Sequence, residues 1–346
     1  MGLDGRRMVR LPDGTFVPAV GQGTWLMGED AARRPGELAS LRAGLDAGLT
    51  LIDTAEMYGE GAAESLVGEV LRAEAADGGA WDGEPVAGGS GVLRAAGVPG
   101  DEASDRGAAS AAGGAAGYGM MPVGRVSAVG SAARARPFLV SKVYPHNAGR
   151  DRIFDACAAS RARLGVDCLD LYLLHWRGEV PLAETVSCMG ELVARGWIRR
   201  WGVSNFDVED MEELLAIPGG ESCATNQVLY HLGSRGIEVA LLPWMRAHGI
   251  PAMAYCPLAQ GGRLTRGLLA DPAVRAVAER HGATPAQVLL AFVVRAGDVI
   301  AIPKAGSAAH ARENAGALSL CLDERDVAEL DAAFPAPEFR VALDTQ

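Results

Sequence analysis

The sequence has 346 residues, of which 49% are hydrophobic and 22% charged, and it carries a formal net charge of −11. A chain of this length and apolar content can bury a large core, either as one β/α barrel or as two ordinary domains. The acidic balance argues against nucleic acid as a partner, because phosphate binding needs a concentrated basic surface.

The six cysteines are scattered, without the C-x-x-C spacing or His/Cys clustering of a zinc site or a disulfide framework. The first ten residues are polar and lack the apolar segment of a signal peptide, and no apolar run reaches the length of a membrane span. We therefore expect no bound metal, no membrane partner and a location in the reducing cytoplasm.

Residues 8–17 are predicted to form a hairpin, because a Pro-Asp-Gly turn separates two short apolar runs. Residues 19–25 follow as the first strand of a larger sheet, with glycines that allow close backbone approach. Apolar residues then recur at helical spacing over 36–47 and 62–72, and a strand that ends at Asp53 lies between these segments. This alternation of strand and helix is typical of a parallel sheet.

The alternation stops at about Glu74. From there to Arg136 the sequence is rich in Gly and Ala, and neither a strand period nor a helical period persists. We expect a long disordered insertion in what is otherwise a single domain spanning residues 1–346. Two apolar spots, at Trp81 and at residues 118–123, could dock a partner, although collapsed coil is the simpler interpretation.

After the insertion the alternation resumes and continues to the end of the chain. Strands are predicted at 138–143, 168–175, 198–205, 224–230, 250–259 and 299–305, and helices at 151–164, 182–195, 208–216, 238–248, 285–295, 307–318 and 323–334. With the two earlier strands this makes eight, the number of a closed (β/α)8 barrel. A helix-to-strand connection in such a barrel lies at the amino-terminal face, so the insertion would lie opposite the chemistry.

Three successive strands end in single ionisable residues, Asp53, Lys142 and His175, and Tyr58 lies in the loop after the first of them. A phenol is a poor acid at neutral pH, so a Lys142 cation that lowers the phenol pKa would make it a better proton donor. Asp53 would hold the lysine charged, and His175 could donate a hydrogen bond to a carbonyl oxygen. Taken alone, an Asp after a strand is more often a cap or turn former.

At these four residues the sequence resembles the aldo-keto reductases, and the resemblance extends to about Pro335 apart from the insertion. It implies a (β/α)8 TIM barrel with the catalytic tetrad Asp53, Tyr58, Lys142 and His175. It also implies NADPH-dependent reduction of aldehydes or reactive ketones, such as methylglyoxal, as in bacterial aldehyde reductases. Hydride would reach the carbonyl carbon while Tyr58 protonates the oxygen.

The resemblance further assigns an apolar substrate wall to Trp25 and Trp176. Without it, a role for Trp25 in the core is an equal alternative. The choice of substrate depends on the loops at the barrel mouth, chiefly those after Trp25, Trp176 and Tyr230. We expect a small-molecule carbonyl substrate and a monomeric protein.

No GxGxxG follows the first strand, so a Rossmann dinucleotide site is not supported. The resemblance assigns the nicotinamide carboxamide to Ser204, Asn205 and Gln227, whose groups can both donate and accept hydrogen bonds. For Ser204 and Asn205, capping of the following helix is the rival interpretation. The remaining positions that it implies around the nicotinamide and the pyrophosphate are Gly23, Thr24, Tyr255, Leu258 and Gln260, with the Tyr255 ring stacked under the nicotinamide.

Lys304 precedes a helix that begins near Ser307, and a lysine beside a helix amino terminus is a suitable anion site. The resemblance places the adenosine 2′-phosphate here, with Lys304, His310, Glu313 and Asn314. His310 stands where an arginine is common, and a largely neutral histidine would hold the phosphate less tightly. We still expect NADPH rather than NADH.

The loop after Tyr255 also departs from the family. Cys256, Ala259 and Gln260 stand where Ser, Gly and Ser are more usual. This loop is therefore expected to differ in detail from the family pattern.

Two other classes of function are considered. A barrel that binds NADPH without turnover would be a redox-sensing regulatory subunit, and steady NADPH consumption with a small aldehyde distinguishes an enzyme from it. A metal-dependent barrel hydrolase lacks the clustered His and carboxylate ligands that it needs. The tetrad favours the reductase.

Overall fold

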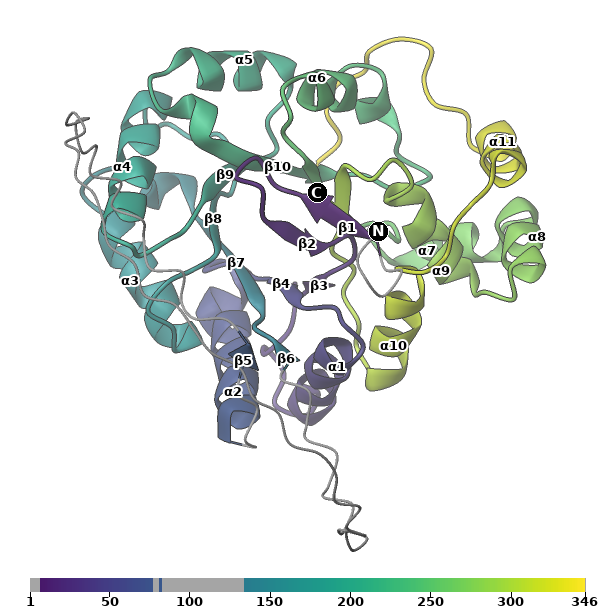
Figure 1. Ribbon diagram of the computed structural model, residues 1–346, viewed down its shortest axis with the longest axis horizontal. Helices are drawn as coiled ribbons and strands as arrows, with labels where there is room; N and C mark the ends of the chain where they lie inside the picture. The colour runs from purple at the N-terminus through teal and green to yellow at the C-terminus, as the bar shows by residue number, and fades with distance from the viewer. Residues whose placement is uncertain (1–6, 77–80, 83–133, 346) are drawn as a thin grey trace, which may run out of the picture.

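The protein is described by a computed structural model that covers residues 7–76, 81–82 and 134–345. Its centre is a sheet of eight parallel strands in the order β12-β11-β10-β9-β8-β7-β4-β3. Backbone bridges join Val20 to Ala301 and Gly23 to Lys304, so the two edges of the sheet meet and close a barrel. Helices form a ring around it (Figure 1). The predicted (β/α)8 fold is confirmed.

The barrel strands are short and almost entirely buried, as parallel strands are when both faces are covered. Each begins and ends within its predicted range or one residue outside it. They are β3 (Gln22–Gly23), β4 (Leu51–Asp53), β7 (Phe138–Val143), β8 (Leu171–Leu174), β9 (Trp201–Ser204), β10 (Cys223–Leu229), β11 (Ala252–Tyr255) and β12 (Val299–Ala301).

The helices cover the outside of the barrel. They are α1 (Arg34–Asp46), α2 (Ala62–Ala76), α3 (Ile153–Leu164), α4 (Leu182–Ala194), α5 (Val208–Ala216), α6 (Leu241–Ala247), α7 (Gly262–Ala270), α8 (Pro272–Arg280), α9 (Pro285–Val293), α10 (Ala308–Gly316) and α11 (Glu324–Ala333), with 3-10 turns η1 (Tyr58–Gly61), η2 (Pro145–Asn147), η3 (Gly220–Ser222) and η4 (Gly236–Glu238). None of the described helices is long and apolar enough to cross a membrane.

Two of these helices, α7 and α8, were not predicted. A loop was expected after Tyr255, but α7 begins at Gly262 within that segment. The start of α8 did carry a signal, because Asp271 caps the helix through the Ala273 amide and Pro272 occupies its first turn.

The strand that ends at Asp53 is held firmly by its own apolar residues. Leu51 and Ile52 are fully buried, and burying a side chain of this size stabilises the fold by about 1.5–3 kcal/mol. Lys142, in contrast, is a fully buried cation in the adjacent strand β7. Burial of a charge is costly unless it is paired, so Lys142 requires hydrogen-bond partners inside the barrel.

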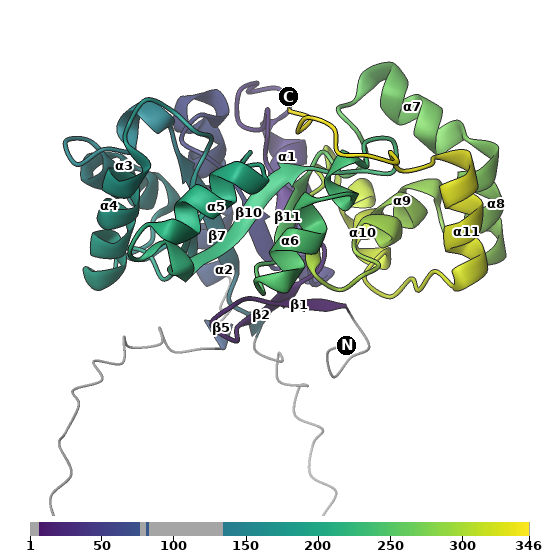
Figure 2. The same cartoon turned by 90° about the horizontal axis from the view of Figure 1, so that it is seen from above.

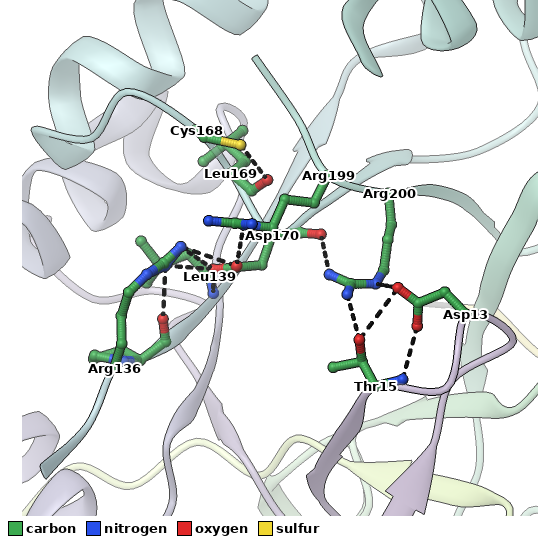
Figure 3. Close-up of polar contacts among 10 residues, drawn as sticks. Asp13, Thr15, Arg136, Leu139, Cys168, Leu169, Asp170, Arg199 and Arg200 are labelled. Carbon is green, nitrogen blue, oxygen red and sulfur yellow. Dashed lines mark hydrogen bonds and ion pairs between the residues drawn. The ribbon is translucent and has the colours of Figure 1, made fainter. Parts of the chain in front are cut away.

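The predicted hairpin is formed by β1 (Met8–Arg10) and β2 (Phe16–Pro18). It lies across the amino-terminal end of the barrel (Figure 2). Arg200 fastens it, because the guanidinium donates to Asp13 at 2.6 Å and to the Thr15 hydroxyl (Figure 3). The chain ends at the opposite, carboxyl-terminal end of the barrel.

A cluster of charges around Asp170 joins β7 to β8 at the same amino-terminal end (Figure 3). The carboxylate of Asp170 accepts three hydrogen bonds from the Arg136 guanidinium, one at 2.9 Å and two at 3.0 Å, and one from the backbone amide of Leu139 at 2.9 Å. Arg199 adds an ion pair at 3.2 Å. Arg136 is the last residue of the predicted insertion, so its bonds to Asp170 anchor the chain just before it enters β7.

The predicted insertion, residues 74–136, is described only at its two ends. Its first boundary was placed too early, because Glu74 is buried in the last part of α2 and pairs with Arg42 at 2.7 Å. Short strands β5 (Trp81–Asp82) and β6 (Arg134–Ala135) pair in parallel, which was not predicted. Residues 77–80 and 83–133, including the second apolar spot, lie outside the described part, and the disorder expected for them stays a prediction.

Candidate active site

A cavity of about 490 Å³ opens at the carboxyl-terminal ends of the barrel strands. Asp53, Ser204 and Tyr255, which end β4, β9 and β11, all line it. Barrel enzymes place their chemistry at this end, and sites for small molecules typically measure roughly 300–1,000 Å³. The hairpin and the described residues at the two ends of the insertion, including the β5–β6 pair, lie at the other end of the barrel (Figure 2).

Backbone strain is concentrated around this cavity. Among the described residues, five other than glycine have positive φ: Leu26, Glu60, Asn205, Cys256 and Ala259. Four of these line the cavity, and Glu60 lies two residues from Tyr58, which also lines it. Such a backbone costs about 1–3 kcal/mol for each residue and persists where the surrounding structure enforces it, often at functional sites. Strain therefore marks this cavity independently of any resemblance.

Lys142 lies behind the cavity wall and uses all three of its ammonium protons. Its Nζ donates to Asp53 Oδ2 at 2.8 Å, to the Thr54 carbonyl at 2.9 Å and to the Tyr58 hydroxyl at 2.9 Å. Three donors with three acceptors are the full requirement of the protonated amine. Burial lowers the pKa of Lys142, and the attraction of Asp53 opposes this. The geometry thus describes a buried ammonium.

Asp53 is shared between that ammonium and an amide. Its second oxygen, Oδ1, accepts from Gln227 Nε2 at 2.8 Å. Burial raises the pKa of Asp53, while Lys142 and Gln227 both lower it. The carboxylate is therefore held in one orientation from two sides.

The Tyr58 phenol faces the cavity from the start of the turn η1. Burial raises the pKa of Tyr58 well above its ordinary value, and the negative charge of Asp53 raises it further. The pKa of Tyr58 is therefore shifted upward, opposite to the lowering predicted from Lys142, and burial is the largest cause. The phenol carries its proton at neutral pH, and the Lys142 hydrogen bond stabilises the oxygen when that proton leaves.

His175 is a neutral imidazole beside this phenol. Burial, together with the Lys142 charge, lowers the pKa of His175 to about 2. Its ring lies 5.8 Å from the Tyr58 ring, and its Nδ1 has no hydrogen-bond partner among the described residues. Trp25 packs edge-on against Tyr58, with 4.9 Å between the ring centroids. The ring centroids of Trp176 and His175 are also 4.9 Å apart. Both tryptophans are partly exposed, which rules out the core role considered for Trp25.

Most of the residues predicted to bind a cofactor also line the cavity. Asn205 accepts the Tyr255 hydroxyl at 2.9 Å and donates to Ser204 at 3.3 Å, so these three side chains form one wall. Asn205 is not a helix cap, because Asp207 caps α5. The cavity-lining residues predicted from the sequence are Gly23, Thr24, Trp25, Asp53, Tyr58, His175, Trp176, Ser204, Asn205, Gln227, Tyr255, Leu258, Gln260 and Lys304.

Three of the residues predicted to bind the cofactor lie apart from the cavity lining. His310, Glu313 and Asn314 are on α10, beyond Lys304; the first is exposed and the last is buried. The Ser307 hydroxyl caps that helix through the His310 amide at 3.3 Å.

Sequence reasoning missed several lining residues. Leu26 and Met57 are next in sequence to the predicted site residues Trp25 and Tyr58. That adjacency is the sequence signal that could have identified them. Thr265 lies on the unpredicted helix α7, and no motif marked it. The further lining residues are Cys256, Pro257, Ala259, Gly261, Ile302 and Pro303.

The protonated phenol, supported by a buried ammonium, can therefore donate a proton to a molecule bound in the cavity at the carboxyl end of the barrel strands. The sequence comparisons identify the family. The model of the Aldo/keto reductase family matches residues 19–82 and 120–334. Methylglyoxal reductase YeaE of Escherichia coli (strain K12) is 46% identical over 339 residues, which are 98% of this chain and 99% of that protein. The chain belongs to the aldo/keto reductase family.

Solved structures agree with this assignment. An aldo/keto reductase from Klebsiella pneumoniae in complex with NADP and acetate superimposes with a TM-score of 0.79 at 44% identity, covering 99% of this chain and 100% of that one. A Klebsiella pneumoniae aldo-keto reductase in complex with NADPH gives 0.78 at 45% identity, covering 99% of each chain. The family resemblance seen in the sequence is therefore confirmed.

Proposed function

We propose that this protein reduces methylglyoxal and related small aldehydes to alcohols with NADPH. The observation that carries the proposal is the Tyr58 phenol, which faces a cavity and is hydrogen-bonded to a buried ammonium. The relative from Escherichia coli, similar over nearly its whole length, is a methylglyoxal reductase, and this supports the choice of substrate.

The chemistry of the cavity fits NADPH. Ser204 and Gln227 offer a hydroxyl and an amide for a carboxamide, and the Tyr255 ring can stack under a nicotinamide. Thr265, in the first turn of α7, also lines the cavity, and its buried hydroxyl has no hydrogen-bond partner among the described residues. A helix start with an unpaired hydroxyl suits a pyrophosphate, and Lys304 suits a further phosphate. When bound, NADPH supplies the hydride.

The side chains around the phenol have distinct roles in this proposal. Tyr58 donates its proton to the carbonyl oxygen of the substrate, and Lys142 stabilises the phenolate that forms. His175, being neutral, orients the carbonyl by a hydrogen bond. Trp25 and Trp176 pack against the apolar part of the aldehyde.

Steady-state consumption of NADPH with methylglyoxal tests the proposal. We expect turnover that saturates with the aldehyde and leaves an alcohol as product. Tight NADPH binding without turnover on any of a panel of small aldehydes would instead identify a redox-sensing subunit. Equal catalytic efficiency with NADH would contradict the assigned cofactor preference, because Lys304 would then contribute nothing selective.

A further inference from the structure

A second buried carboxylate, Glu64, lies on the outer side of β7, behind Lys142. Glu64 is on α2 and is fully buried. The Ser141 hydroxyl donates to its Oε1 at 2.5 Å, and Arg163 Nε on α3 pairs with its Oε2 at 2.5 Å. Successive side chains of a strand point to opposite faces. The Ser141 side chain therefore points outward to the helices, and the Lys142 side chain points into the barrel interior.

The same cluster reaches the turn that carries Tyr58. The Arg163 side chain lies against Gly61, the last residue of η1, because a Cβ added there would fall 2.5 Å from Arg163 Cδ and Nε. The Ser65 hydroxyl, on the residue after Glu64, donates to the Gly61 carbonyl at 2.9 Å. Glu64 is therefore linked to both segments that form the proton donor, through Ser141 to the lysine strand and through Arg163 to the tyrosine turn.

We propose that Glu64 is a positioning residue for proton transfer, which holds Lys142 and Tyr58 at hydrogen-bond distance through Ser141 and Arg163. This inference rests on the proposed role of Tyr58. It assigns a function to a carboxylate that does not line the cavity. Its negative charge also acts on Lys142, because Glu64 raises the pKa of that amine. The ionisable groups that face Lys142 are Asp53, Tyr58, Glu64 and His175.

The substitution Glu64→Gln keeps the shape of the side chain and removes its charge. Arg163 is partly exposed and can turn to water, so the variant should fold. We expect kcat for methylglyoxal to fall about 10- to 100-fold, the range for a misplacement of about 1 Å in an active site. KM and the NADPH dissociation constant should stay near the wild-type values.

Glu74→Gln provides the matched control. Glu74 lies on the same helix, is also buried, and forms its own ion pair with Arg42 at 2.7 Å, but far from Lys142. A purely structural role for Glu64 predicts similar changes in both variants. Equal kcat for the two, per folded molecule, would overturn the proposal.

A readout that needs no turnover is available, because the chain has two lysines, Lys142 and Lys304. Protein labelled with 15N-lysine therefore gives two side-chain nitrogen signals, and Lys304 serves as an internal reference. We expect the pKa of Lys142 to be lower in Glu64→Gln than in wild type and unchanged in Glu74→Gln, with Lys304 the same in all three. An unmoved Lys142 titration would overturn the proposal, whether or not any aldehyde is reduced.

Ser141→Ala covers the case in which Glu64→Gln does not fold. It leaves the Glu64–Arg163 pair in place and breaks the link to the strand. A lower kcat with unchanged NADPH affinity supports the positioning role, and a wild-type kcat refutes it.

Discussion

Two buried charge clusters lie at opposite ends of strand β7. At the carboxyl end, Lys142 binds Asp53 and Tyr58. At the amino end, Asp170 binds Arg136 and the backbone of Leu139 (Figure 3). Both ends hold a buried charge with several partners, but only the first includes a group that can release a proton into a cavity.

This difference shows that a buried ion pair does not by itself indicate chemistry. Removing one partner of an ion pair costs stability at either end of a strand, by about 3–5 kcal/mol where the remaining charge is left buried and by less where it can reach water. Function requires in addition a titratable partner with access to a substrate, which Tyr58 provides and Leu139 does not. Substitution at either end should therefore lower stability, but only substitution at the carboxyl end should also lower the rate.

The largest effect is expected from Tyr58→Phe, which removes the proton donor and leaves the aromatic ring. General acid catalysis contributes about 10²–10⁴-fold, so kcat for methylglyoxal should fall by that factor. NADPH affinity, measured by fluorescence titration, should be nearly unchanged. Retention of most of the turnover would remove Tyr58 from the mechanism.

Asp170→Asn tests the amino end. Hydrogen bonds to charged groups contribute about 1.5–3 kcal/mol each, and Arg136 is partly exposed, so we expect a loss of about that size in the free energy of unfolding. Turnover per folded molecule should stay at the wild-type value. Urea denaturation and kinetics on the same sample measure both quantities.

Asp13→Asn is the control for that variant. It breaks a more exposed pair with Arg200 and should cost less than about 1 kcal/mol. A large loss of kcat in Asp170→Asn, with Asp13→Asn normal, would show that the amino end also serves catalysis.

A smaller effect is expected from the pH dependence of His175. The pKa of His175 is about 2 in the folded protein, against an ordinary value of 6.5. Below pH 6.5 the unfolded state therefore binds more protons, and this contribution to stability is lost as the pH falls from 6.5 toward 2. Between pH 6.5 and pH 5 the loss is about 2 kcal/mol, since each pKa unit corresponds to about 1.4 kcal/mol.

His175→Gln should remove this part of the pH dependence. The stability of wild type and variant, followed by thermal or urea unfolding, should differ in slope between pH 6.5 and pH 5. Parallel curves would mean that His175 already titrates normally in the folded protein.

Much of the fold could be predicted because strand and helix alternate with clear periods. Helix α5, for example, was predicted over its observed range from its apolar periodicity. In the structure a capping box of Asp207 and Asp210 fixes its start. Helix α7 was missed because it begins in a glycine pair that favours a loop. The end of α2 was placed too early because Glu74 is stabilised by Arg42, a contact with another helix that no local pattern contains.

The site was predictable where a single residue follows a strand, as with Asp53 and His175. The direction of the Tyr58 pKa shift could not be predicted from the sequence, because it depends mainly on how deeply the phenol is buried in the folded protein. The role of Glu64 was equally hidden, since Ser141 and Arg163 come from distant parts of the chain. Burial and long-range contact are properties of the folded protein.

The central claim is that Tyr58 and Lys142 act as one proton-donating unit. A double-mutant cycle with Tyr58→Phe, Lys142→Met and the combined variant tests it most directly, with kcat for methylglyoxal measured per folded molecule. The account predicts that the combined variant turns over about as slowly as Tyr58→Phe alone. Losses that multiply would show that the two residues contribute independently and would contradict it.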